Sequence, residues 1–181
     1  MASPCTRDGG TAVTLNGSSG YVRYATALSI PTTYTGEAWF RTTTTRGGLI
    51  LGFGAAATGA SATVDRVLYM TNAGGLVFGV NTAAKSTISG SGPYNDNAWH
   101  HVMVTVGTAG MRLYVDGTLV ASSTVTATAA YTGYLRVGYD SLTGWANAPT
   151  SFFFAGTVDE VAVYATTLTA AEASSHYHAG P

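Results

Sequence analysis

The stretch AWHHVMVTVGTAGMRLYVDGTLV, residues 98–120, decides the fold class of this chain. Every second residue from 102 to 106 is valine, and the segment 111–116 alternates in the same way after a turn that contains glycine. Alternation with a period of two is typical of a half-buried strand, and Asp-Gly between two such runs is a strong hairpin signal. The pair Asp116-Gly117 therefore predicts a second tight turn directly after the first hairpin.

The composition agrees with a sheet protein and limits the functions. The 181 residues include 23 glycines and 11 tyrosines but only 8 basic and 9 acidic side chains. The length suits one domain, which we expect to span residues 11–181 after an N-terminal tail of residues 1–10. With a formal net charge of −1 and no basic run, nucleic acid is not an expected partner, because phosphate binding needs clustered Lys and Arg.

The sequence also bears on localisation. It contains no run of 18 apolar residues, so no membrane insertion is expected. The first ten residues, MASPCTRDGG, lack the apolar core of a signal peptide. Two origins stay open: a module excised from a secreted protein, or a protein that reaches the outside by another route, such as a virion component released by lysis. Both place the domain outside the cell or on a virion surface.

Short alternating segments separated by turns continue along the whole chain. We expect strands at 11–16, 20–25, 35–42, 48–53, 66–71, 75–80, 99–107, 111–116, 118–123, 133–138, 152–156 and 157–165. About a dozen short strands predict an all-β fold of two antiparallel sheets packed as a sandwich. Thr169 and Glu172 form the sequence pattern of a capping box, which predicts one short C-terminal helix running to about Tyr177.

Five segments in order carry a resemblance to a known family: AVTLNGSSGYV, TGEAWFRT, AWHHVMVTV, LYVDG and GTVDEVAVYATTLTAAEASSHY. They resemble the laminin G-like, concanavalin A-like jelly-roll domains of the lectin/glucanase superfamily. The segment DSLTGWANAPTS at 140–151 is similar, more narrowly, to modules of actinobacterial secreted proteins and phage tails. The resemblance implies a jelly-roll β-sandwich. It leaves the function open, because one fold hosts many functions and this family includes both sugar-binding modules and glycosidases.

Glycoside hydrolysis has the least support among these functions. Retaining glycosidases need two carboxylates about 5–5.5 Å apart, and relatives with that activity place them two or more residues apart on one strand. No predicted strand of this chain carries such a pair, and the adjacent Asp159 and Glu160 face opposite sides of a strand. We therefore expect a non-catalytic recognition or adhesion module, with a glycoside hydrolase as the weakest alternative.

A sugar site is expected in the loop at 139–152. Trp145 offers a flat apolar ring beside the hydrogen-bonding groups of Asp140 and Asn147, a pairing that suits the C–H face and hydroxyl rim of a sugar. Tyr94 lies in a second polar and aromatic loop. This interpretation needs a partly exposed Trp145 and a glycan or cell-surface polysaccharide as partner. In the alternative, Trp145 folds back to close the sandwich and the Asp and Asn side chains cap turns.

The rival to recognition is a purely structural role. A near-neutral sheet module without paired catalytic acids also suits a decoration or spacer domain of a virion or cell-surface protein. Its partners would then be other chains of that assembly rather than a small ligand. The sequence does not decide between the two roles.

The resemblance also implies a structural Ca²⁺ site. Family members use the aspartate of the closing strand with carbonyls of the first turn, which here correspond to Asp159 with Asn16 and Gly17. Such oxygens are the ligands that Ca²⁺ prefers, and a carboxylate facing the apolar side of a strand is costly unless it is paired. Asn16 stands where many relatives have Asp, which weakens the site. The alternative is that Asp159 caps turn backbone without a metal.

Overall fold

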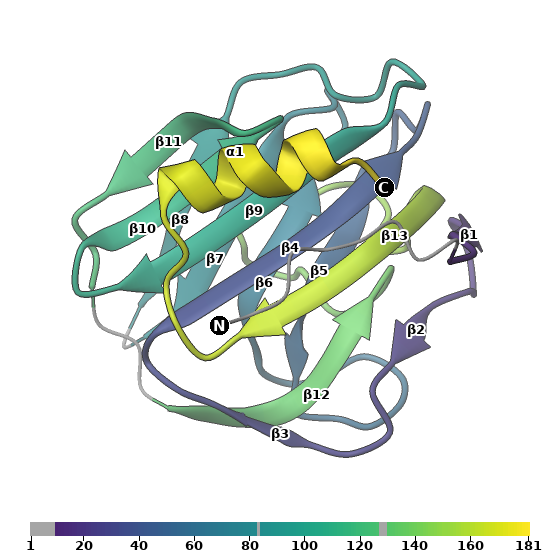
Figure 1. The fold of residues 1–181 in the computed structure, drawn as a ribbon. Helices are drawn as coiled ribbons and strands as arrows, with labels where there is room; N and C mark the ends of the chain where they lie inside the picture. Colours follow the sequence, from purple (N-terminus) through teal and green to yellow (C-terminus); the bar gives the residue numbers. More distant parts are fainter. Residues whose placement is uncertain (1–9, 83, 127–129) are drawn as a thin grey trace.

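Two antiparallel β-sheets pack face to face in the computed structural model of the protein, which describes residues 10–82, 84–126 and 130–181 (Figure 1). The all-β sandwich with one C-terminal helix is as the sequence predicts. Nearly all of the predicted tail, residues 1–9, lies outside the described residues. None of the described residues forms a helix with the length and apolar character that crossing a bilayer requires.

The first sheet has six strands in the order β1-β13-β4-β9-β10-β11. They are β1 (Val13–Asn16), β13 (Ala155–Tyr164), β4 (Tyr34–Arg41), β9 (His100–Gly107), β10 (Gly110–Val115) and β11 (Thr118–Ser123). The hairpins predicted from residues 98–120 are present, with Val104 opposite Leu113 in the β9–β10 pair. Asp116 and Gly117 both have positive φ, 50° and 73°, as a tight primed turn between twisted strands requires.

The second sheet follows the order β2-β12-β5-β6-β7-β8, and a short β3 also pairs with β12. Its strands are β2 (Val22–Arg23), β12 (Tyr131–Val137), β5 (Gly48–Gly54), β6 (Val64–Met70), β7 (Leu76–Asn81), β8 (Lys85–Gly90) and β3 (Leu28–Ile30). The edge strand β8 was not predicted, because its sequence KSTISG contains one large apolar residue, Ile88. The segment 152–154, predicted as the start of a strand, is instead a connection that places Phe154 in the core.

The main core lies between the sheets and consists of inward-facing residues of both. Buried members include Phe40 and Val104 from the first sheet and Leu51 and Phe78 from the second. The alternate residues of the same strands face outward, so each sheet also presents side chains on its outer face. On the middle strands these outward residues are buried as well, because other segments cover them.

Helix α1 (Ala170–Ala179) covers the outer face of the first sheet (Figure 1). The predicted capping box is present: the Thr169 hydroxyl accepts a hydrogen bond from the Glu172 backbone N–H, and the Thr169 N–H donates to the Glu172 carboxylate at 2.7 Å. Ala173 packs against Met103 and Tyr114 of the sheet. The helix is therefore part of the folded domain and not an appended tail.

A polar cluster fastens the helix to the sheet. The carboxylate of Glu37, 4% exposed on β4, accepts hydrogen bonds from the Tyr164 hydroxyl of β13 at 2.7 Å and from Nδ1 of His176 at 2.8 Å. Nε2 of His101 on β9 approaches it at 3.3 Å. Burial alone would raise the pKa of Glu37, but the hydrogen bonds from these three side chains outweigh it and lower the pKa.

We expect this cluster to make the domain sensitive to acid. Because the folded-state pKa of Glu37 is lowered, its contribution to the free energy of unfolding is complete above the unfolded-state pKa of about 4.3 and is lost as the pH falls through the folded-state value. Glu37→Gln should lower the stability at pH 7 by about 1–3 kcal/mol and weaken the acid dependence. Thermal melts of the wild type and of Glu37→Gln, from pH 7 down to below the unfolded-state pKa, check this expectation. If the melting temperatures of the two proteins change with pH in the same way, Glu37 is not the source of the acid sensitivity.

Candidate functional site

The outer face of the second sheet carries a second apolar cluster. Outward-facing side chains of β5, β6 and β7 form its floor, and the connection between β12 and β13, residues 138–154, folds over them. The buried members are Leu49, Val64, Val67, Tyr69, Val77, Leu142 and Trp145, with Phe152 packed beside them. The loop in which we expected a sugar site is therefore also a structural cover.

Trp145 is buried, with 4% of its surface exposed, so the expectation of a partly exposed stacking ring is wrong. The ring lies against Gly79 of β7, where an added Cβ would come within 2.2 Å of Trp145 Cζ3. On the outside, Nζ of Lys85 lies 5.1 Å from the ring centroid and donates a hydrogen bond to the carbonyl of Thr143 at 2.7 Å. The alternative is correct: Trp145 closes the outer face of the sheet.

The carboxylate of Asp140 is also buried and hydrogen-bonded within the protein, which corrects its assignment as a ligand-binding residue. Its carboxylate is 1% exposed and accepts hydrogen bonds from the backbone N–H and hydroxyl of Ser61 at 2.7 and 2.8 Å. It also accepts from the Ser141 N–H, and Nε of Arg136 lies 3.4 Å away. Asp140 thus anchors the start of the covering loop and leaves no oxygen facing solvent.

The expected calcium ligands are not brought together by the structure. Strand register places Asn16 opposite Ala155, four residues before Asp159 and so about 13 Å away along the strand. Oδ1 of Asn16 accepts hydrogen bonds from three backbone N–H groups, those of residues 18, 19 and 20, each at 3.0 Å. Gly17, with φ 71°, completes this local turn.

Asp159 has a local role of its own. Its carboxylate accepts a hydrogen bond from the N–H of Glu160 at 3.0 Å, where a bulge gives Glu160 a positive φ of 47°. Asp159, Asn16 and Gly17 therefore do not fit a shared Ca²⁺, and a backbone cap is what Asp159 forms. Across the described ranges, no group of three His, Cys, Asp or Glu side chains is placed to hold a metal ion.

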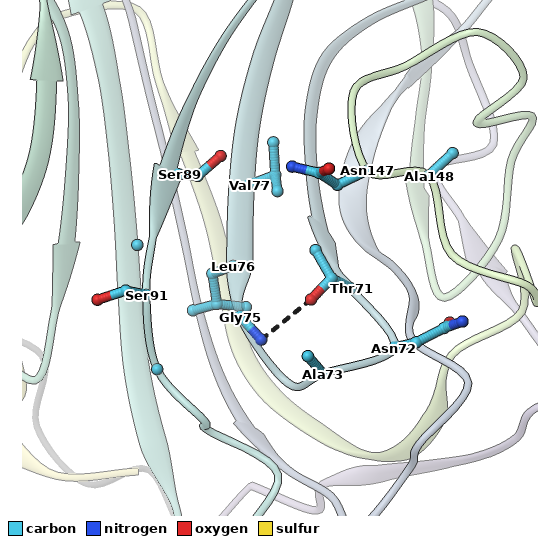
Figure 2. A pocket seen from close by; sticks show the side chains of 12 residues that line it. Thr71, Asn72, Ala73, Gly75, Leu76, Val77, Ser89, Ser91, Asn147 and Ala148 are labelled. Carbon is cyan, nitrogen blue, oxygen red and sulfur yellow. Dashed lines mark hydrogen bonds between the residues drawn. The ribbon is translucent and has the colours of Figure 1, made fainter.

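Beside the middle of the covering loop, the outer face of the second sheet is left open as a groove of about 450 Å³ (Figure 2). Strands β7 and β8 form its floor, where Val77 pairs in register with Ser89. The turn between β6 and β7 closes one end, and Asn147 and Ala148 form a side wall. The lining residues are Thr71, Asn72, Ala73, Gly75, Leu76, Val77, Ser89, Gly90, Ser91, Gly92, Asn147 and Ala148.

The groove combines uncharged polar groups with apolar surface. Figure 2 shows the Ser89 hydroxyl and the Asn147 carboxamide on opposite sides of Val77, both directed toward it. Both side chains are exposed and make no hydrogen bond to another described residue. The Thr71 hydroxyl accepts a hydrogen bond from the Gly75 N–H at 3.2 Å and keeps its own proton to donate. Three hydrogen-bonding side chains are thus available beside the apolar surface of the groove, although Val77 itself is buried beneath it.

Of the expected ligand-binding residues, Asn147 lines the groove and Tyr94 lies beside it. Asn147 adopts a positive φ of 50°, directly after the segment that Trp145 anchors. The Tyr94 ring packs on Gly92, where an added Cβ would lie 2.4 Å from Cδ2, and meets His100 edge-on at 5.3 Å. Tyr94 therefore packs against Gly92, a lining residue, and does not itself line the groove.

Ser89 and Thr71 were missed by sequence reasoning. Ser89 lies on β8, the strand that the alternation of apolar residues did not reveal. Thr71 directly follows β6 and looks like an ordinary turn residue. Only the pairing of β7 with β8 and the position of the covering loop bring them together with Asn147.

The comparisons with known proteins settle the family. A family profile described as Concanavalin A-like lectin/glucanases superfamily matches residues 16–174. The chain belongs to this superfamily. The laminin G-like resemblance is thereby confirmed. Among curated protein sequences, none matches the chain.

Solved structures with the same fold come from several organisms. A heptameric SAP-like pentraxin from Limulus polyphemus superposes with a TM-score of 0.65 at 18% identity, over 89% of this chain and 78% of that one. The CBM40 domain of a Ruminococcus gnavus sialidase, bound to α2,3-sialyllactose, gives 0.61 at 16% identity, over 84% and 93%. Mouse laminin α1 domains LG4-5 give 0.61 at 20%, over 84% of this chain and 40% of that one. At these identities the likeness shows the fold.

We expect Trp145 to be a stability residue. Trp145→Ala removes a buried aromatic side chain and should lower the free energy of unfolding by about 3–5 kcal/mol. Ser89→Ala, a change at an exposed position on β8, should cost less than about 0.5 kcal/mol. Denaturant unfolding of the two variants checks this difference. A loss below about 1 kcal/mol for Trp145→Ala would mean that the ring is not held against Gly79.

We also expect chelation of divalent cations to leave the melting temperature unchanged. A metal that binds only the folded state stabilises it by mass action, and Asp159 and Asn16 are too far apart to share one. Thermal melts with EDTA and with added Ca²⁺ measure the effect. A melting temperature that falls with EDTA in the wild type, but not in Asp159→Asn, would reinstate the metal site.

Proposed function

We propose that this domain is a non-catalytic recognition module that binds glycans in the groove formed by β7, β8 and the wall at residues 147–148. The observation that supports this proposal is the groove itself, in which the side chains of Ser89, Asn147 and Thr71 lie beside apolar surface. A sugar presents hydroxyls around an apolar C–H face, so it needs both kinds of contact within one shallow site.

The chemistry of the groove favours binding over hydrolysis. Hydroxyl and carboxamide groups, such as those of Ser89 and Asn147, bind sugar hydroxyls but do not serve as the paired acids of a glycosidase. The family supports recognition in general terms, since it includes lectins, and the structurally similar CBM40 domain has been solved with a sialylated sugar. We place the domain on a cell or virion surface, where such a module would meet its ligand.

The competing proposal is a spacer or decoration domain whose partners are other protein chains. It is favoured by the exposed apolar side chains of Leu119 and Val120 on the edge strand β11. A strand at a sheet edge is a surface that other chains can pair with. The two proposals place the contact on different strands, so variants on β8 and β11 separate them.

We expect the intact chain to show saturable binding on a glycan array. Ser89→Ala and Asn147→Ala should each weaken binding about 3- to 10-fold, because each removes one hydrogen bond to the ligand. Thr118→Ala, an exposed change on β11, is the matched control and should leave binding unchanged. Recovery of intact glycans after incubation would support recognition without catalysis.

Two results would contradict the proposed function. The absence of saturable binding to any glycan on the array would favour the spacer role. Binding that persists in the Ser89→Ala, Asn147→Ala double variant would place the glycan elsewhere on the domain. Melting curves of each variant show whether the fold is retained.

A further inference from the structure

We propose that the groove selects neutral saccharides over sialylated or uronic acid-containing ones. This inference rests on the proposed function and concerns the ligand class of the same site. All twelve residues that line the groove are uncharged. The hydroxyls of Ser89 and Thr71 and the carboxamide of Asn147 each both donate and accept hydrogen bonds, so they match the hydroxyls of a neutral sugar in either direction.

An acidic sugar would lose more than it gains in this groove. Its carboxylate gives up hydration on entering a partly enclosed site, and that cost is recovered when a cation makes charge-assisted hydrogen bonds. The groove offers its ligand only neutral donors, such as the Asn147 amide and the Ser89 hydroxyl. A hydrogen bond from a neutral donor to a carboxylate is charge-assisted, but it brings no opposite charge to offset the lost hydration. An acidic ligand therefore binds more weakly than its neutral counterpart.

Lys85, the cation on the same strand as Ser89, binds groups of the covering loop and not of the groove. Lys85 begins β8, four residues before Ser89 and about 13 Å away along the strand. Its ammonium group donates to the Thr143 carbonyl and covers the Trp145 ring. Moving it toward a ligand would break both contacts and uncover the ring. Lys85 therefore serves the covering loop and leaves the groove neutral.

Arg46 is the other cation to consider, since it lies in the connection that leads into β5. That connection reaches the same end of the sheet, because Gly48 pairs with Met70, just before Thr71. The backbone carbonyl of Arg46 accepts a hydrogen bond from the Ser151 N–H at 3.1 Å, while its side chain is not part of the lining. Arg46→Ala is therefore a control that should not alter selectivity.

The test compares matched probes on an array, namely neutral oligosaccharides and the same oligosaccharides capped with sialic acid. Lactose and α2,3-sialyllactose are one such pair. We expect the intact chain to bind neutral members at least about 10-fold more tightly than their capped counterparts. Binding of the neutral members should change little from about 0.05 to 0.5 M salt, because no ion pair is involved. Arg46→Ala should behave as the wild type.

A gain-of-function variant sharpens the test. Ala148 is an exposed wall residue, so Ala148→Arg adds a guanidinium beside the groove and should raise affinity for the sialylated members about 10-fold. Ala148→Gln adds similar bulk without charge and should not. Equal or tighter binding of sialylated members by the wild type would overturn the selectivity while leaving the proposed function intact. If no member of either set binds, the proposed function fails and the selectivity with it.

Discussion

Both sheets of this sandwich carry apolar side chains on both faces, so each outer face needs a cover in addition to the shared core. Helix α1 covers the first sheet through Ala173 and the Glu37 cluster. The loop at 138–154 covers the second sheet through Trp145, which fits because Gly79 beneath it has no side chain. The cover on the second sheet is shorter than the face beneath it, and the groove is the part left open.

The fold was predictable because its signals are local. The alternation in β9 and β10 and the positive-φ pair Asp116-Gly117 act over neighbouring residues, so the sequence alone identifies the hairpins. The capping box of α1 is equally local. Strand β8 escaped because, as an edge strand with exposed serine and lysine side chains, it carries almost no apolar pattern. Prediction thus failed where tertiary pairing, and not local patterning, holds the strand.

The site was harder to predict, because burial of a loop residue depends on partners far away in the sequence. Trp145 has small and polar sequence neighbours that favour exposure, but its contacts come from Gly79 and Lys85, more than fifty residues earlier. Asp140 looks like a free carboxylate until Ser61 donates two hydrogen bonds to it. Only Asn147, which no distant residue contacts by hydrogen bond, keeps the solvent-facing role expected of it.

The same buried contacts that keep Trp145 away from solvent also fix one wall of the groove in which we propose that glycans bind. The Tyr69 hydroxyl donates a hydrogen bond to the carbonyl of Ala146, between the anchored Trp145 and the wall residue Asn147. The backbone on the near side of Asn147 is therefore fixed before any ligand arrives. Ordering a loop on binding costs free energy that a preorganised wall avoids. The glycan binding that we propose relies on this saving, because the groove has no aromatic ring among its lining residues and each hydrogen bond that they offer is individually weak.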